Sequence, residues 1–207
     1  MLNKIIVVFP GQGSQIVGMG KEFYDRYDVV KKLFQEADDT LGINLSKIIL
    51  NGPKEQLDLT ANTQPAIFLI SYSIFQVIKN QFNINLNDTK YFAGHSLGEY
   101  SALSCANYLD FNQTIKILRI RGDAMQNSVH QGEGGMLAVL GSTIKDIEKI
   151  LVDNEKNFKA FIANDNTEGQ LVISGKINDL EKLSDILKNK SDKEIQIFKD
   201  QIIDDAK

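Results

Sequence analysis

The amino-acid sequence predicts an α/β fold, in which a core with parallel strands carries a smaller inserted subdomain. Two short apolar segments are each followed by a turn and a helix, and further helices separate them, an order typical of parallel sheets. The pattern changes at a glycine-rich stretch over residues 131–135, after which six elements follow in the order βαββαβ. The 207 residues, 43% of them hydrophobic, are enough to bury a substantial core.

Apolar spacing predicts the core elements in chain order. Residues 5–9 are apolar and largely β-branched, which indicates a strand covered on both faces. Pro65 suits the first turn of a helix over residues 66–82, whose apolar residues surround it and predict burial. The other core elements are a strand over residues 90–94 and helices over residues 22–27, 29–41, 97–108 and 111–128. Val30, Leu33, Phe34 and Ala37 face inward from the helix over 29–41, and Ile115, Leu118 and Met125 from the helix over 111–128.

The six later elements form a complete ferredoxin-like split motif. We therefore divide the chain into a core over residues 1–130, a subdomain over 131–199 and a short acidic tail over 200–207. Because the subdomain closes just before this tail, we expect an incomplete core that exposes apolar strand faces and an unpaired sheet edge. The predicted elements of the subdomain are strands over residues 136–140, 158–163, 170–174 and 194–198 and helices over 143–153 and 177–189.

Composition argues against several classes of function. The net charge of −4 is spread along the chain and gives no electrostatic footprint for nucleic acid. No apolar stretch is long enough to cross a bilayer or to form a signal-peptide core, so we expect a cytoplasmic protein without a membrane partner. The single cysteine, Cys105, lies among apolar helical residues, which predicts a packed thiol in a reducing compartment. No cluster of histidine, cysteine and carboxylate residues indicates a metal site.

The run Gly94-His95-Ser96-Leu97-Gly98 has the spacing of a nucleophile elbow and stands between a predicted strand and a predicted helix. Such a tight turn needs small flanking residues, which the two glycines supply. The serine hydroxyl then projects above the sheet at a helix N-terminus, where negative charge is stabilised. The backbone N–H of Leu97 is placed to donate to the oxyanion of a tetrahedral intermediate. Ser96 is therefore predicted to be a nucleophile that carries an acyl group.

Four further motifs accompany the elbow, which continues as Glu99-Tyr100. They are Phe9-Pro10-Gly11-Gln12-Gly13-Ser14-Gln15, Thr63-Gln64-Pro65-Ala66, Arg121-Gly122 with Met125-Gln126, and Asn164-x-Asn166 with the run from Gly169 to Gly175. Together the five motifs resemble the malonyl-CoA:acyl carrier protein transacylase family of fatty-acid synthesis, over residues 5 to 198. The resemblance implies an α/β-hydrolase-like core with an inserted ferredoxin-like subdomain, in agreement with the element order.

The resemblance assigns two principal roles. Gln12 would complete the oxyanion hole with the Leu97 N–H, and Arg121 would bind the malonyl carboxylate through two parallel hydrogen bonds. The loop around Gln12 is otherwise a plain turn, because it lacks the Gly-Lys-Ser/Thr of a phosphate-binding loop. Arg121 is otherwise a surface residue with Arg119 as an ordinary neighbour. The two arginines point to different faces of a helix, so at most one enters the site.

The implied substrate-binding set comprises Arg121, Gln64, Met125, Asn166 and His95. Gln64 and Asn166 are alternatively polar anchors of their loops. His95 adjoins the nucleophile, but on a sharp elbow its side chain points elsewhere, so an orienting or structural role is expected. The other histidine, His130, is expected to be a surface residue.

The resemblance also implies a general-base histidine a few residues beyond Phe198. The chain has two histidines, both upstream, and its end reads Ile202-Ile203-Asp204-Asp205-Ala206-Lys207. We therefore hypothesise a C-terminally truncated member of the family, either a fragment or a shortened reading frame. Loss of the base would reduce the rate by a factor on the order of 10⁴ to 10⁶.

The predicted function is transfer of a malonyl group from malonyl-CoA to the phosphopantetheine thiol of acyl carrier protein, through a malonyl-serine intermediate. We expect a monomer and no cofactor beyond the coenzyme A thioester that serves as substrate. Two alternatives stay open: a serine esterase or thioesterase, indicated by the elbow spacing alone, and an inactive chain that binds coenzyme A or carrier protein, indicated by the absent base.

Overall fold

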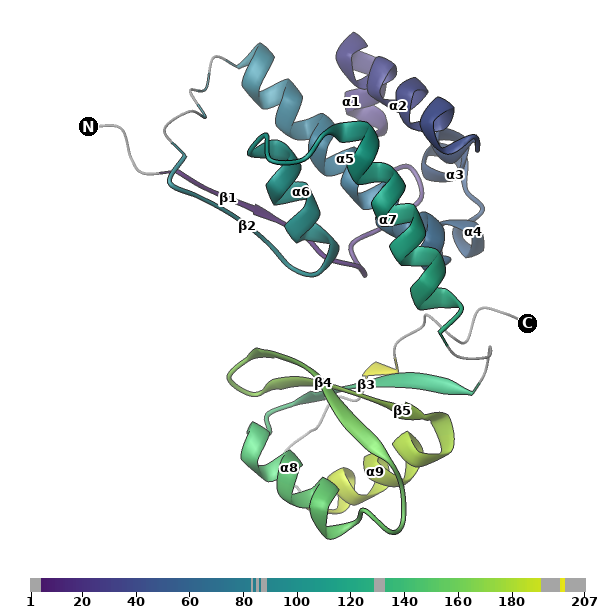
Figure 1. Ribbon diagram of the computed structural model, residues 1–207, viewed down its shortest axis with the longest axis vertical. Coiled ribbons are helices and arrows are strands. Elements are labelled where there is room, and N and C mark those ends of the chain that lie inside the picture. Colours follow the sequence, from purple (N-terminus) through teal and green to yellow (C-terminus); the bar gives the residue numbers. More distant parts are fainter. Residues whose placement is uncertain are drawn as a thin grey trace. The chain divides into compact units, whose positions relative to one another are not determined.

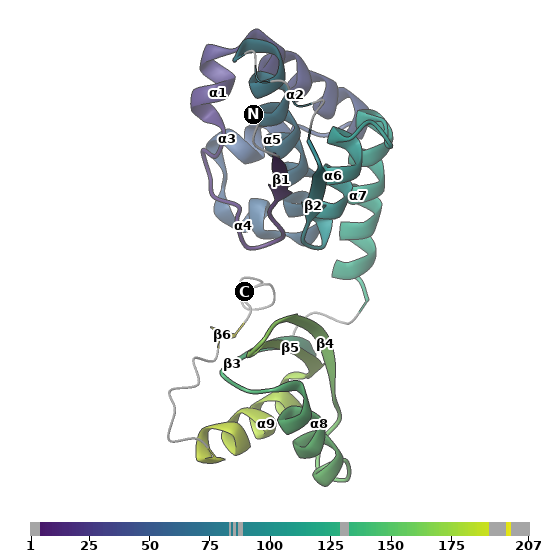
Figure 2. The same ribbon diagram turned by 90° about the vertical axis from the view of Figure 1, so that its left-hand side faces the viewer.

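The computed structural model describes residues 5–82, 84, 86, 89–128, 133–190 and 198–199. The chain divides into two compact units, Met1–Gln126 and Asn127–Lys207 (Figure 1). The first unit combines a small parallel sheet with helices, and the second packs two helices on an antiparallel sheet (Figure 2). The mixed α/β class predicted from the sequence is confirmed.

The first unit contains more helices than the sequence predicts. Its described strands are β1 (Ile6–Phe9) and β2 (Tyr91–Gly94), and its helices are α1 (Lys21–Arg26), α2 (Asp28–Leu41), α3 (Leu45–Asn51), α4 (Lys54–Asp58), α5 (Thr60–Gln81), α6 (Leu97–Cys105) and α7 (Phe111–Gln126). The additions are α3 and α4, which are too short to show an apolar period. A local cap nevertheless defines the start of α3, where the Asn44 side chain accepts a hydrogen bond from Lys47 N.

Strands β1 and β2 pair in parallel, with Ile6 opposite Tyr91. The expectation that β1 is covered on both faces is wrong. Ile6 and Val8 are 58% and 72% exposed, whereas Phe9 is 7% exposed. Side chains alternate across a strand, so one face of the sheet packs inward and the other, which carries Ile6, Val8 and Tyr91, is open in the described part of the chain.

Helix α5 is buried along much of its length, as predicted, but it begins six residues earlier than expected, at Thr60. Pro65 therefore lies inside the helix and not in its first turn. A proline has no N–H to donate to the carbonyl four residues before it, which here is Ala61 O. Arg119 of α7 donates to that carbonyl instead, with Nη1 3.3 Å from the oxygen. A donor from another helix thus takes the place of the N–H that Pro65 lacks.

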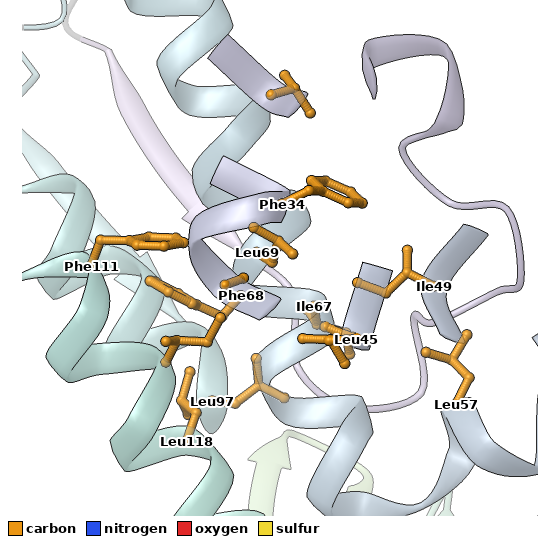
Figure 3. Packing of buried hydrophobic residues seen from close by; sticks show 14 of the residues in the cluster. Phe34, Leu45, Ile49, Leu57, Ile67, Phe68, Leu69, Leu97, Phe111 and Leu118 are labelled. Atoms are coloured by element: carbon orange, nitrogen blue, oxygen red, sulfur yellow. The ribbon is translucent and has the colours of Figure 1, made fainter. Parts of the chain in front are cut away.

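The core of the first unit is built where α2, α5 and α7 pack together, and Figure 3 shows its aromatic and aliphatic side chains meeting. Phe68 of α5 is fully buried and stacks against Phe111, with ring centroids 5.5 Å apart. The prediction that Met125 faces the core is wrong. Met125 lies in the last turn of α7 and is 41% exposed. The other predicted core residues of α2 and α7 are buried or partly buried: Val30, Leu33, Phe34, Ala37, Ile115 and Leu118.

The second unit has the topology of a ferredoxin-like fold. Its sheet order, β4-β5-β3-β6, is antiparallel throughout and places the first and third strands of the unit side by side at the centre. The predicted strand over residues 194–198 lies mostly outside the described residues, as do residues 200–207. The elements are β3 (Gly134–Leu140), α8 (Ile144–Asp153), β4 (Ala160–Thr167), β5 (Gln170–Lys176), α9 (Ile177–Lys190) and β6 (Phe198–Lys199).

Two sequence expectations about single features can be compared with the structure. Cys105 is buried, which confirms a packed side chain, and this burial raises the pKa of its thiol to about 12. Among the described residues, no helix is both long enough and apolar enough to span a membrane.

The core contact of Phe68 gives a test of the first unit. All six tyrosines lie in this unit and the chain has no tryptophan, so tyrosine fluorescence reports its unfolding. Phe68→Ala is expected to lower the free energy of unfolding by about 3–5 kcal/mol, because it leaves a cavity in close-packed surroundings. Phe82→Ala, at a phenylalanine that is 57% exposed, is the control and should change it by less than about 0.5 kcal/mol. Equal losses in urea titrations of the two variants would contradict this description of the core.

Candidate active site

Ser96 joins β2 to α6 in a backbone conformation that is unusual for a residue with a side chain. Its φ is 54° and its ψ is −114°, and it is one of two non-glycine residues with positive φ in the described chain. Such a conformation costs about 1–3 kcal/mol and persists where the surroundings enforce it. Hydrogen bonds enforce it here: His95 N donates to Phe9 O (3.3 Å) and Gly98 N to His95 O (2.9 Å). The Ser96 side chain is left exposed.

The two glycines of the elbow are required by close backbone contacts. A Cβ on Gly94 would lie 2.0 Å from the carbonyl carbon and oxygen of Gly98. A Cβ on Gly98 would lie 2.6 Å from Phe9 O and 2.7 Å from Pro10 O. Any larger residue would therefore push α6 away from the strands, and with it the serine.

The N-terminus of α6 offers a donor beside Ser96. Leu97 is the first residue of the helix and is fully buried, and its N–H has no acceptor within the helix. The next two N–H groups are occupied, Gly98 N by His95 O and Glu99 N by Ser96 O. The Leu97 N–H and the positive end of the helix dipole are thus available to an anion near the serine.

Arg121 of α7 brings a positive charge to Ser96. Its Nη2 donates to Ser96 Oγ (3.1 Å) and its Nη1 to Gln64 Oε1 (2.8 Å). Gln64 is fully buried on α5, and its Nε2 donates to Met125 Sδ (3.1 Å). The guanidinium carbon also lies 5.9 Å from the centre of the Tyr100 ring. Three sequence-predicted residues, Gln64, Arg121 and Met125, therefore form one chain of contacts that ends at Ser96.

The loop after β1 lies beside the elbow, because parallel strands end at the same edge of a sheet. The position of a Cβ on Gly11 would be 2.7 Å from His95 Nδ1, so the His95 ring lies against this loop. This placement supports an orienting role for His95. Gln12 follows, and its Nε2 donates to Thr60 Oγ1 (3.3 Å) at the start of α5.

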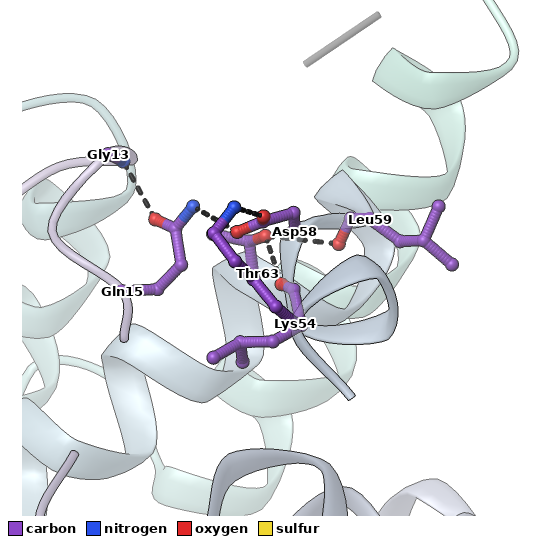
Figure 4. Close-up of polar contacts among 7 residues, drawn as sticks. Gly13, Gln15, Lys54, Asp58, Leu59 and Thr63 are labelled. Atoms are coloured by element: carbon purple, nitrogen blue, oxygen red, sulfur yellow. Dashed lines mark hydrogen bonds and ion pairs between the residues drawn. The ribbon is translucent and has the colours of Figure 1, made fainter. Parts of the chain in front are cut away.

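A second polar contact anchors the far side of that loop. Gln15 Oε1 accepts from Gly13 N (2.9 Å), and Gln15 Nε2 donates to Asp58 Oδ1 (3.0 Å), as Figure 4 shows. Lys54 forms an ion pair with the other oxygen of Asp58. Burial raises the pKa of the Asp58 carboxyl, but the hydrogen bonds from Lys54 and Gln15 outweigh it and leave the pKa below its ordinary value.

Several of these anchors were missed by sequence reasoning. Thr60, Asp58 and Arg119 belong to none of the five sequence motifs, and the motif that contains Gln15 indicates no role for it. Each acts through a partner about fifty residues away or on another element, so no local pattern indicates it.

The two remaining residues singled out from the sequence, Asn166 and His130, belong to the second unit. Asn166 is half-buried on β4, in the second unit. His130 lies outside the described residues. Within the described ranges, no group of three or more histidine, cysteine, aspartate and glutamate side chains could hold a metal ion.

Comparisons with known proteins agree on one family. The sequence matches the acyl transferase domain over residues 6–198. The malonyl CoA-acyl carrier protein transacylase of Bacillus subtilis is 42% identical over 189 residues, or 90% of this chain and 58% of that protein. The crystal structure of the acyl-carrier-protein-S-malonyltransferase from Bartonella henselae has a TM-score of 0.86 at 42% identity, covering 93% of this chain and 62% of the other.

A third comparison includes a carrier protein. A solved complex of a type II polyketide-synthase acyl carrier protein with its malonyl-transacylase contains a chain that matches with a TM-score of 0.87 at 34% identity. The match covers 97% of this chain and 63% of that one. The present chain therefore spans about three fifths of the length of these relatives.

The close approach of α6 to β1 is tested by Gly98→Ala. We expect a loss of about 2 kcal/mol in the free energy of unfolding, since the added methyl group meets backbone oxygens that cannot rotate away. Ser101→Ala is the control on the same helix. It removes a buried hydroxyl that has no hydrogen-bond partner among the described residues, and it is expected to be nearly neutral. A neutral Gly98→Ala in urea titrations would contradict the contact.

The Asp58 anchor is tested by Asp58→Asn at varying pH. At neutral pH we expect a loss of about 1.5 kcal/mol, from two charge-assisted hydrogen bonds. Because the folded-state pKa is lowered, the contribution is complete above the ordinary value of 3.8 and is lost as the pH falls below it. Asp25→Asn is the control, because Lys21–Asp25 is also an i,i+4 pair but is more than half exposed at both ends. A difference between wild type and Asp58→Asn that stays constant down to the lowest pH would contradict the argument.

Proposed function

The chain belongs to the acyl transferase domain family, and from this we propose that it transfers a malonyl group from malonyl-CoA to the phosphopantetheine thiol of acyl carrier protein. The family was predicted from the five sequence motifs, and the comparisons confirm it. The names of the relatives support malonyl-CoA and acyl carrier protein as the substrates. They include proteins of polyketide synthesis, so both that pathway and fatty-acid synthesis are consistent with the family.

The observation that carries the proposal is the contact between Arg121 and Ser96. A malonyl group on Ser96 has its carboxylate carbon roughly 4 Å from Oγ, given carbon–carbon bonds of about 1.5 Å. Arg121 Nη2 lies 3.1 Å from Oγ, within reach of that carboxylate. A planar guanidinium binds a carboxylate through two hydrogen bonds, and an acetyl group offers no such partner.

The reaction would proceed through two half-reactions. Ser96 Oγ forms a bond to the thioester carbonyl carbon, the carbon–sulfur bond breaks, and coenzyme A leaves as its thiol after taking up a proton. The Leu97 N–H and Gln12 stabilise the oxyanion of the tetrahedral intermediate. The carrier thiol then attacks the malonyl-serine carbonyl and gives its proton to the departing Ser96 oxygen. In the first unit, the proposed substrate-binding residues are Arg121, Gln64, Met125 and His95.

The expected rate of malonyl-serine formation depends on a group that accepts the proton of Ser96. In the described part of the chain the partner of Ser96 Oγ is a guanidinium, which has no lone pair to accept a proton. No base therefore contacts the nucleophile among these residues. We expect the 207-residue chain by itself to form malonyl-serine slowly.

The proposal extends to the predicted organisation and setting of the protein. Residues 1–130 would form the α/β-hydrolase-like core that holds the nucleophile, and residues 131–199 the ferredoxin-like subdomain. Acyl transfer changes no oxidation state, so we propose no cofactor besides the thioester substrate. We also propose that the protein is a cytoplasmic monomer without nucleic-acid or membrane partners. The esterase alternative is not favoured, because the relatives named here are transacylases or malonyltransferases.

Intact-mass measurement after incubation with malonyl-CoA tests the function. We expect slow appearance of a malonyl adduct on wild type and none on Ser96→Ala. Arg121→Ala is expected to lower the malonylation rate about 100-fold but not the acetylation rate from acetyl-CoA, because the charged hydrogen bonds serve the carboxylate. Arg26→Ala is the matched control, since Arg26 lies on α1 against Tyr27.

Three outcomes would contradict the proposal. Persistent coenzyme A binding without any adduct on wild type indicates an inactive binding chain. Release of free malonate as fast as transfer to carrier protein indicates an esterase. An equal loss of malonylation and acetylation in Arg121→Ala removes the carboxylate-binding role.

A further inference from the structure

The first turn of α5 carries a backbone defect. Pro65 cannot donate to Ala61 O, so that carbonyl lacks its helical partner although Ala61 is buried. An unpaired buried carbonyl is costly, and a donor from elsewhere in the fold must satisfy it.

Arg119 of α7 supplies this donor. Its Nη1 donates to Ala61 O (3.3 Å) and to the side-chain oxygen of Asn62, while its Nε donates to Asp123 Oδ2 (3.2 Å). The guanidinium therefore joins α7 to two consecutive residues of α5. Sequence reasoning treated Arg119 as an ordinary surface neighbour of Arg121, and these bonds correct that interpretation.

Two neighbours of Arg119 on α7 strengthen the same contact. Gln126 Oε1 accepts from Ala61 N (3.3 Å). A Cβ on Gly122 would lie 2.6 Å from Thr60 O and 2.7 Å from Ala61 Cα, so the two helices touch at this point. Side chains of α7 thus bind both the backbone N–H and the carbonyl oxygen of Ala61 in the first turn of α5.

The turn that Arg119 holds also carries two groups of the candidate active site. Thr60 Oγ1 accepts from Gln12 Nε2, and Gln64 Oε1 accepts from Arg121 Nη1. Gln12 belongs to the loop beside the elbow, and Arg121 contacts Ser96 Oγ. A shift of this turn would move both groups relative to the nucleophile.

We propose that Arg119 is a positioning residue of the acyl-transfer site, which aligns Arg121 and Gln12 with Ser96 by fixing the first turn of α5. The inference rests on the proposed function for the meaning of that alignment. Lysine cannot replace arginine here, because a single ammonium cannot donate at once to Ala61 O, Asn62 and Asp123 with the spread of a planar guanidinium. Arg119 itself contacts neither Ser96 nor the reacting atoms in the described structure.

Titration with malonate and acetate, followed by ¹⁵N NMR of arginine side chains, tests the proposal without requiring acyl transfer. The chain has three arginines, at positions 26, 119 and 121, so lysine variants assign every Nε–Hε signal. In Arg119→Lys we expect the Arg121 signal to move before ligand is added. We also expect malonate binding to weaken about tenfold and the preference for malonate over acetate to fall.

Two controls separate positioning from folding and from mere proximity. Arg26→Lys makes the same chemical change at a distant site. Ile120→Ala removes a side chain that is 67% exposed and lies between the two arginines in sequence. Both should leave the Arg121 signal and the malonate affinity within twofold of wild type. Should Arg119→Lys fail to fold by tyrosine fluorescence, Asn62→Ala removes one acceptor of the same contact and leaves both arginines.

The outcomes are distinct for the two proposals. A folded Arg119→Lys with an unchanged Arg121 signal and unchanged malonate preference overturns the positioning role. A wild type that binds malonate no better than acetate counts against the proposed function. In that case movement of the Arg121 signal in ligand-free Arg119→Lys, beyond that in Ile120→Ala, still supports positioning, and its absence still overturns it.

Discussion

The close contact of α6 with the end of β1 is the constraint on which the first unit's site depends. Ser96 has a φ of 54°, which is unfavourable for a residue with a side chain, and the surrounding backbone must hold it there. Gly98 allows this by lying against Phe9 O and Pro10 O. Because β1 supports the elbow, the loop that leaves β1 begins beside it, with Gly11 against His95. Ser96 and the loop that carries Gln12 are therefore brought together by one backbone contact.

The charge in the site comes from a separate contact, between α5 and α7. The buried amide of Gln64 is oriented by its two neighbours: its oxygen faces the Arg121 guanidinium and its nitrogen faces Met125 Sδ. The reverse orientation would set two donors against each other in Arg121 and Gln64. This contact directs Arg121 toward Ser96 from α7, whereas the elbow lies between β2 and α6. The elbow and the α5–α7 contact are joined by the hydrogen bond from Arg121 Nη2 to Ser96 Oγ.

Features with a local signal could be predicted from the sequence. The elbow, the βαββαβ order and the inward face of α2 each follow from spacing within one segment. Exposed apolar strand faces were expected of an incomplete core, but their place at Ile6 and Val8 was not, because an apolar run does not say which face is covered. The predicted position of Pro65 in the first turn of the helix was wrong for a related reason. The donor that takes the place of its missing N–H is Arg119, 58 residues away from Ala61. Roles carried by long-range partners leave no pattern at either position.

The bond from Arg121 to Ser96 links recognition to attack under the proposed function. A donor held on the serine oxygen occupies one of its two lone pairs and makes the oxygen a weaker nucleophile. A carboxylate binds a guanidinium more strongly than a neutral hydroxyl does, so a malonyl carboxylate would displace Ser96 from Nη2 as it binds. An acetyl thioester brings no carboxylate and leaves the bond in place. The same guanidinium would then recognise the acyl group and release the nucleophile, which places part of the selectivity in the rate of attack and not in affinity alone.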